Sequence, residues 1–166
     1  FWGGDESNNG RNYAVYVLVL SNNAKDTSFG KYEKIRSNHG REKWNLRIGN
    51  RKFRFTISNE HPCGEKRDLL GRIYGSLLHE EIDDNVAQLK IFLDGNVPFR
   101  ERSYIISYIA EATFREYSSI MVRTEPYFDM HNVLVNKADR VANFLYRTRT
   151  LEELEMDKRF KPMLDF

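Results

Sequence analysis

Apolar residues alternate with polar ones, or run almost unbroken, over several short stretches of the chain, and these stretches predict β-strands. The clearest is residues 13–20, YAVYVLVL, which is rich in β-branched and aromatic side chains. Residues 52–58, KFRFTIS, alternate strictly and so predict a strand with one apolar face. A first strand is predicted to end near Trp2, and the polar run from Asp5 to Gly10 predicts the turn of a hairpin. A fifth, short strand is predicted at residues 119–123.

The fourth predicted strand, in QLKIFLDG at residues 88–95, ends on a carboxylate. Leu89, Ile91 and Leu93 point one way, whereas Phe92 and Asp94 point the other way. Phe92 on the second face indicates that both faces are covered, as in a central strand. The strand breaks after Asp94, and this edge of an open α/β sheet is where ligands bind.

Helical spacing of apolar residues predicts three longer helices, at residues 66–81, 99–117 and 133–147. In the last of these, Asp139 flanks the apolar stripe instead of lying opposite to it. The pattern is weaker between residues 22 and 50, where we expect a short helix within 28–37 and an extended piece near 44–48.

The predicted order of elements is β-β-β-α-β-α-β-α. Strands that alternate with helices favour an α/β fold, here a mixed five-stranded sheet with helices on both faces. The length of 166 residues suits a single domain. We assign this domain to residues 1–150 and a charged C-terminal extension, a short helix and a tail, to residues 151–166.

Composition excludes several classes of protein. Cys63 is the only cysteine, so no internal disulfide can form, and a reducing, cytoplasmic location is expected. The absence of CxxC and HxxxH spacings argues against a structural zinc site. No apolar run approaches the roughly 20 residues that span a bilayer, so no membrane partner is expected.

Basic residues are concentrated in one part of the chain. The net charge is +2, but residues 31–54 hold nine basic and two acidic side chains, so the remainder is negative. Such asymmetry indicates either a polyanionic partner or a solvated surface hairpin. If the partner is a nucleic acid, the best binding candidates are Arg41, Lys43, Trp44, Arg47 and Arg51.

Three acids lie at places that suit a shared site: Asp5 after the first strand, Asp94 at the end of the fourth, and Asp139 on the last long helix. Three converging carboxylates repel one another unless a cation binds them, and Mg²⁺ prefers oxygen ligands. Two such ions roughly 4 Å apart catalyse phosphodiester cleavage in known enzymes. The alternatives are ordinary: turn residues at Asp5 and Asp94, and a solvated helix residue at Asp139 that pairs with Arg140 or Asn143.

The order of these elements and acids resembles the ribonuclease H-like superfamily. It is similar, more narrowly, to an uncharacterised branch with Asp-Glu-Ser at the first strand, an Asp closing a later strand, and Ala-Asp-x-x-Ala on the final helix. Here the matching residues are Asp5-Glu6-Ser7, Asp94, and the run from Ala138 to Ala142, so the resemblance covers residues 1 to about 147. It implies a nuclease-type site in which Asp5, Asp94 and Asp139 hold Mg²⁺ or Mn²⁺.

Enzymes of this superfamily often use a fourth acid, for which Glu42 and Glu6 are the candidates. Glu6 points away from Asp5 if the first strand continues past it. His131, just before the last long helix, is a candidate general base. Asn136, one turn before Asp139, could hydrogen-bond a metal ligand.

The function we expect from the sequence is a metal-dependent nuclease that acts on a nucleic acid. The alternatives are a nucleic-acid-binding module without catalysis and a protein-interaction module that reuses the fold. The sequence leaves open whether the substrate is DNA, RNA or a hybrid, and it leaves the oligomeric state open.

Overall fold

A computed structural model describes residues 1–7, 12–27, 51–60 and 68–164 of the chain. Its centre is one mixed sheet with the strand order β3-β2-β1-β4-β5. Neighbours are antiparallel from β3 through β2 to β1, and parallel from β1 through β4 to β5. The strands are β1 (Trp2–Ser7), β2 (Ala14–Leu20), β3 (Lys52–Ser58), β4 (Leu89–Asp94) and β5 (Ile120–Glu125).

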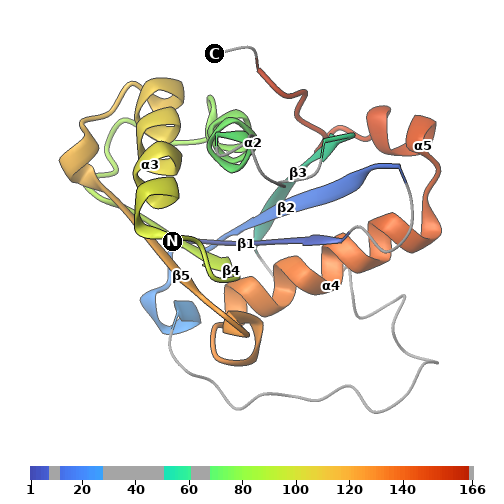
Figure 1. Cartoon of the computed structure of the whole chain (residues 1–166), viewed down its shortest axis with the longest axis horizontal. Helices are drawn as coiled ribbons and strands as arrows, with labels where there is room; N and C mark the ends of the chain where they lie inside the picture. Colours follow the sequence, from blue (N-terminus) through green and yellow to red (C-terminus); the bar gives the residue numbers. More distant parts are fainter. Residues whose placement is uncertain (8–11, 28–50, 61–67, 165–166) are drawn as a thin grey trace.

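Helices cover both faces of the sheet, as Figure 1 shows. On one face lie α2 (Leu69–Leu78) and α3 (Phe99–Thr113), and on the other lies α4 (Val133–Thr148). Short 3₁₀ turns, η1 (Ala24–Thr27), η3 (Tyr117–Ser119) and η4 (Phe128–Met130), join these elements. The predicted α/β architecture, with a mixed five-stranded sheet between helices, is therefore confirmed.

Two consecutive glycines in β1 let the helices approach the sheet closely. A Cβ atom on Gly3 would lie 2.4 Å from Leu134 of α4, so this helix packs directly on the strand backbone. A Cβ on Gly4 would lie 2.8 Å from Leu18 and Leu93 and 3.0 Å from the Tyr74 ring of α2. Because side chains alternate along a strand, Gly3 marks the α4 face and Gly4 marks the opposite face.

Each face of the sheet has its own apolar core. The core beneath α2 and α3 includes Trp2, Leu18, Ile91 and Leu93, all at most 2% exposed. The core beneath α4 includes Val17 and Phe55 of the sheet, and the helix contributes Leu134, Ala138, Val141, Ala142 and Leu145. Every residue of 14–19 is buried, which explains why the run YAVYVLVL gave such a strong strand signal.

Most predicted elements form with small differences in length. The bounds of β3 agree with the prediction, and α4 extends one residue further than predicted. Helix α3 ends at Thr113 instead of residue 117, because Phe114 adopts a left-handed conformation with φ of 53°. Strand β5 continues to Glu125, two residues past the prediction. The short helix within 28–37 and the extended piece near 44–48 lie outside the described residues.

The prediction for β1 was wrong in one respect. Asp5, Glu6 and Ser7 were assigned to a turn, whereas they continue the strand and pair with Val17, Tyr16 and Val15 of β2. Their composition favours a turn, but pairing with the strongest strand in the chain outweighs this local preference. Asp5 therefore has the fixed orientation of a strand residue.

The C-terminal segment packs on the sheet. Helix α5 (Leu151–Glu155) starts with a capping box between Thr150 and Glu153, and it buries Leu154. The chain then runs parallel to β3, where the N–H of Lys161 donates to the Phe55 carbonyl at 2.8 Å. The boundary predicted at residue 150 stays a prediction. Among the described residues, no helix is both long and apolar enough to cross a membrane.

Candidate active site

Asp5 and Asp94 lie at the same edge of the sheet and on the same face. The parallel register pairs Gly3 with Phe92 and Gly4 with Leu93, so one further step along both strands sets Asp5 beside Asp94. Gly3 and Phe92 face α4, and side chains two residues further along a strand point the same way. The two carboxylates therefore share the α4 face at the carboxyl ends of β1 and β4.

Helix α4 carries Asp139 to this place because it contacts β1 at two points. Near its start Leu134 packs on Gly3, and further along Ser7 Oγ donates to Asn143 Oδ1 at 3.2 Å. Asp139 lies between these points, alongside the Asp5 segment of the strand. Asn143 Nδ2 donates to Asp139 Oδ1 at 2.5 Å, so Ser7, Asn143 and Asp139 form one hydrogen-bonded chain.

A fourth acid, Asp129 in η4, also lies at this edge, and the sequence reasoning missed it. The turn is held by Asp94, whose Oδ1 accepts from the Phe128 N–H at 2.5 Å. The Phe128 ring packs edge-on against Phe92 with 5.8 Å between centroids. Asp129 follows the carboxyl end of β5, so the rule that singled out Asp94 also pointed to this residue.

Burial and the charges of neighbouring acids raise the pKa values of three of these four carboxyl groups. Burial raises the pKa of Asp5 to about 8, with repulsion from Asp139, Asp94 and Asp129 as further causes. Burial, followed by repulsion from Asp129, raises the pKa of Asp139 to about 6. The pKa of Asp129 is raised by burial and then by Asp94. A cation at this edge would relieve the repulsion.

The donor chemistry fits a hard divalent ion, since such ions prefer carboxylate oxygens. Asp5, Asp94 and Asp139 each use Oδ1 in a local hydrogen bond, with the N–H of Glu6, the N–H of Phe128 and the Asn143 amide. Within the described ranges, no group of three or more His, Cys, Asp or Glu side chains is arranged to hold a metal ion.

The remaining candidates from the sequence have different surroundings. Glu6 lies on the face opposite to Asp5, where its charge adds to the effect of burial in raising the pKa of Tyr74. His131 lies near Asp129, where its effect opposes the rise in pKa that burial and Asp94 cause in that carboxyl. The backbone N–H of Asn136 donates to the Asn132 carbonyl at 3.0 Å, and the amide that bonds Asp139 is Asn143. Glu42 lies outside the described residues.

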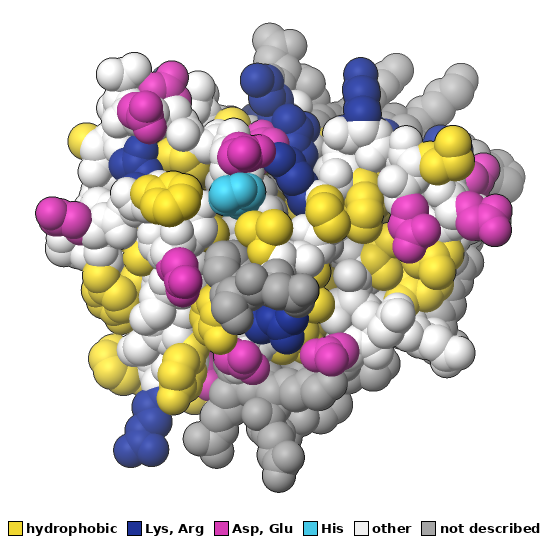
Figure 2. Space-filling view, turned by 90° about the horizontal axis from the view of Figure 1, so that it is seen from above, with side chains coloured by type: hydrophobic (Ala, Val, Ile, Leu, Met, Phe, Trp, Pro, Cys, Tyr) yellow, Lys and Arg dark blue, Asp and Glu magenta, His cyan; other side chains and the backbone are white. Residues whose placement is uncertain are grey.

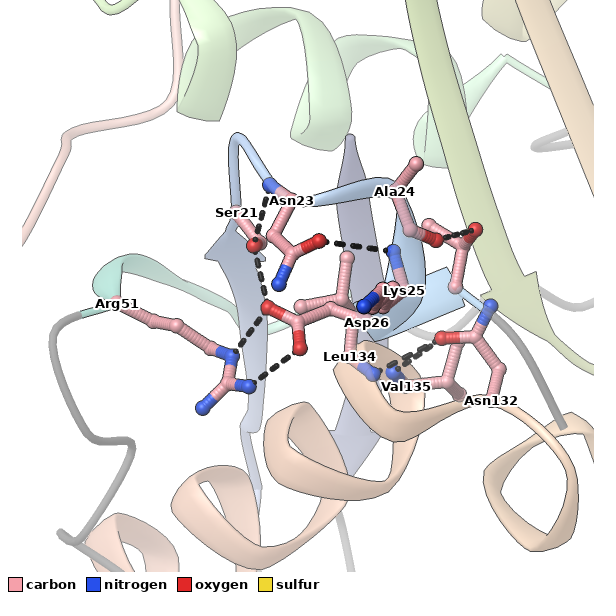
Figure 3. Close-up of polar contacts among 10 residues, drawn as sticks. Ser21, Asn23, Ala24, Lys25, Asp26, Arg51, Asn132, Leu134 and Val135 are labelled. Carbon is pink, nitrogen blue, oxygen red and sulfur yellow. Dashed lines mark hydrogen bonds and ion pairs between the residues drawn. The ribbon is translucent and has the colours of Figure 1, made fainter. Parts of the chain in front are cut away.

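Of the predicted nucleic-acid contacts, only Arg51 falls within the described residues. Figure 3 shows its guanidinium forked onto Asp26, with Nε and Nη2 at 2.9 and 2.6 Å from the two carboxylate oxygens. Ser21 Oγ also donates to Asp26, and the Arg51 hydrogen bonds lower the pKa of that carboxyl. The other four contacts, Arg41, Lys43, Trp44 and Arg47, lie in the part of the chain that the structure leaves undescribed.

The chain has a ribonuclease H-like fold. It is similar to a ribonuclease HII from Archaeoglobus fulgidus, solved in complex with PCNA, with a TM-score of 0.60 and 17% sequence identity. The similarity covers 96% of this chain and 80% of that one. No family model and no curated protein matches the sequence.

Proposed function

We propose that this chain is a divalent-metal-dependent nuclease. The observation that carries the proposal is the gathering of Asp5, Asp94, Asp139 and Asp129 at one edge of the sheet, where burial, and then the charges of the neighbouring acids, raise the pKa values of Asp5, Asp139 and Asp129. Clustered carboxyl groups whose pKa values are raised by burial and by neighbouring charges are candidates for a functional site. The fold shared with a ribonuclease HII supports the same reaction class.

In this proposal Asp5, Asp94 and Asp139 hold Mg²⁺ or Mn²⁺, and Asp129 is a further ligand or a neighbouring charge. The bound ions supply the Lewis acid that phosphodiester hydrolysis requires. Asn143 orients the Asp139 carboxylate from α4, and the Phe128 N–H orients that of Asp94 from η4. These bonds restrict the two side chains before an ion arrives, which is how supporting groups tune metal ligands.

Basic side chains on α4 support a polyanionic substrate. Lys137, Arg140 and Arg147 lie on the helix that carries Asp139, which is its only acid. On the face over α2 and the C-terminal segment, by contrast, acidic side chains are interspersed with basic and hydrophobic ones (Figure 2). The substrate would therefore reach the acids from the α4 side of the sheet.

The test is cleavage of end-labelled DNA, RNA and hybrid oligonucleotides with Mg²⁺, Mn²⁺ or EDTA. Wild-type protein should cleave at least one of these substrates only when a divalent ion is present. Asp94→Asn should abolish cleavage, whereas Asp84→Asn should retain it, because Asp84 is an exposed residue in the turn before the same strand. Full activity of Asp94→Asn, with circular dichroism showing an intact fold, would refute the proposal.

A second candidate is a nucleic-acid-binding module without catalysis. The observation that favours it is that each carboxylate of the proposed triad is engaged locally, and no described group is arranged as a complete ligand set. This candidate predicts salt-sensitive binding without turnover in any divalent ion.

A further inference from the structure

Two aromatic side chains beside the acidic edge are unusually exposed. Phe99 is 76% exposed and Tyr127 is 72% exposed. Phe99 begins α3 five residues after Asp94, and Tyr127 follows the end of β5 and precedes Asp129 by two residues. Because β4 and β5 are parallel neighbours, both loops leave the sheet at the edge that carries the acids.

Backbone hydrogen bonds next to both aromatic residues hold their main chain in place. Phe99 is the first residue of α3 and follows Pro98, whose carbonyl accepts from the Arg102 N–H at 3.0 Å. Tyr127 has a left-handed backbone with φ of 59°, and the next N–H, that of Phe128, is bonded to Asp94. A bulky residue rarely adopts such a φ unless its surroundings hold it there. The hydrogen bond to a proposed catalytic acid thus also fixes the backbone of Tyr127.

One arginine lies close to Phe99, and another lies close to Phe128, the residue that follows Tyr127 in the chain. The Arg102 guanidinium lies 5.7 Å from the centroid of the Phe99 ring. The Arg123 guanidinium, which is also paired with Glu125, lies 5.6 Å from the buried ring of Phe128, the neighbour of Tyr127. Aromatic rings flanked by arginines are typical of surfaces that stack bases and hold the phosphates between them.

We propose that Phe99 and Tyr127 are a stacking platform for unpaired bases, so the ligand at this edge is a single-stranded nucleic acid segment. The proposal rests on the proposed function, because it uses the same edge and the same polyanionic ligand. The two rings would contact the bases directly and would select a single-stranded ligand over a duplex. Paired bases in a duplex already stack on one another and offer no free faces to the two rings.

Phe114 provides a matched control. It is 91% exposed and lies just beyond the other end of α3, which at 15 residues is about 22 Å long. If Phe99 and Tyr127 have no role in binding, their replacement by alanine should change oligonucleotide binding no more than replacement of Phe114 does.

The experiment measures fluorescence anisotropy in EDTA, with a fluorescein-labelled 15-mer of thymidine and a 15-mer of the same charge that lacks bases. Wild-type protein should prefer the thymidine 15-mer. Phe99→Ala and Tyr127→Ala should each weaken binding of that oligonucleotide about tenfold and leave the baseless one unchanged. Phe114→Ala should stay within about twofold of wild type, and Tyr127→Phe should retain binding.

Three outcomes would overturn the proposal: no preference for bases, equal losses on both oligonucleotides, or no binding of either. A protein partner for these rings would give the first or the last. Because ions are absent, failure of the nuclease proposal would appear separately, as lack of divalent-dependent cleavage by a protein that still prefers the thymidine 15-mer. Asp94→Asn should keep the preference while losing cleavage, since its amide oxygen can still accept from Phe128.

Discussion

Asp94 and Phe128 join the two loops that build the candidate site. The Asp94 carboxylate accepts the Phe128 N–H at 2.5 Å, across 34 residues of sequence. One contact thereby fixes the side chain at the end of β4 and the turn that carries Tyr127 and Asp129. Asp94 therefore contributes both to the stability of the fold and to the proposed catalytic site.

Substitutions of Asp94 should separate these two roles. Asp94→Ala removes the acceptor and should lower the free energy of unfolding by about 2 kcal/mol, because it breaks a hydrogen bond to a charged group. Asp94→Asn keeps an acceptor oxygen and should cost about half as much or less. Urea denaturation measures both effects. Equal losses in the two variants would show that the Phe128 bond contributes little.

Stability should fall as pH rises when no divalent ion is present. Asp5 has a pKa of about 8 in the folded protein and near its ordinary value of 3.8 when unfolded, so between these values the folded state holds a proton that the unfolded chain has released. The folded state is therefore progressively destabilised over this range as pH rises. Thermal melts in EDTA at several pH values should show the decline.

Asp5→Asn should remove much of this decline and melt higher than wild type at pH 8. A gain of about 1 kcal/mol corresponds to a rise of about 2–4 °C for a protein of this size. Asp84→Asn, at an exposed turn, should leave the pH dependence unchanged. A lower melting temperature for Asp5→Asn at pH 8 would contradict the conclusion that burial and neighbouring charges destabilise the Asp5 carboxylate.

Asn143 should set the pH at which divalent ions bind. Its amide donates to Asp139 and so favours the charged carboxylate, and Asn143→Ala should raise the pKa of Asp139 above about 6. Ions bind the deprotonated form, so stabilisation by Mn²⁺ in thermal melts should require a higher pH. Asn136→Ala, one turn before Asp139, is the control. A larger shift in the pH required for Mn²⁺ stabilisation in Asn136→Ala would show that Asn136, and not Asn143, orients Asp139.

Gly3→Ala should strongly destabilise the protein. Its Cβ would lie 2.4 Å from backbone and Cβ atoms of Leu134, so α4 would have to move away from β1. A loss of about 3 kcal/mol is expected from such overpacking, measured by urea denaturation. Gly71→Ala is a useful comparison, since its new Cβ would lie 2.5 Å from the Tyr108 side chain but 3.2 Å from the nearest backbone atom, the Tyr104 carbonyl oxygen. A smaller loss at Gly3 than at Gly71 would refute this explanation.

The sequence by itself determined most of the secondary structure, and it predicted three of the four acids of the candidate site, Asp5, Asp94 and Asp139. The runs that became β2, β3 and β4 carry their own strand signal, because buried strands need β-branched and aromatic residues on a fixed two-residue period. Asp94 at the end of β4 and the apolar stripe of α4 follow from the same local patterns. Such periodicities depend on neighbours a few residues away, which a sequence displays directly.

Tertiary structure decided the length of β1 and which residues lie together at the candidate site. Asp5 became a strand residue only through pairing with β2, and Asp129 joined the edge only because β5 lies beside β4. Asn143 reaches Ser7 across 136 residues, a contact that no local pattern contains. Which charges repel, which amide orients them and which rings lie beside them depend on the order of strands in the sheet and on the close approach of α4 over Gly3.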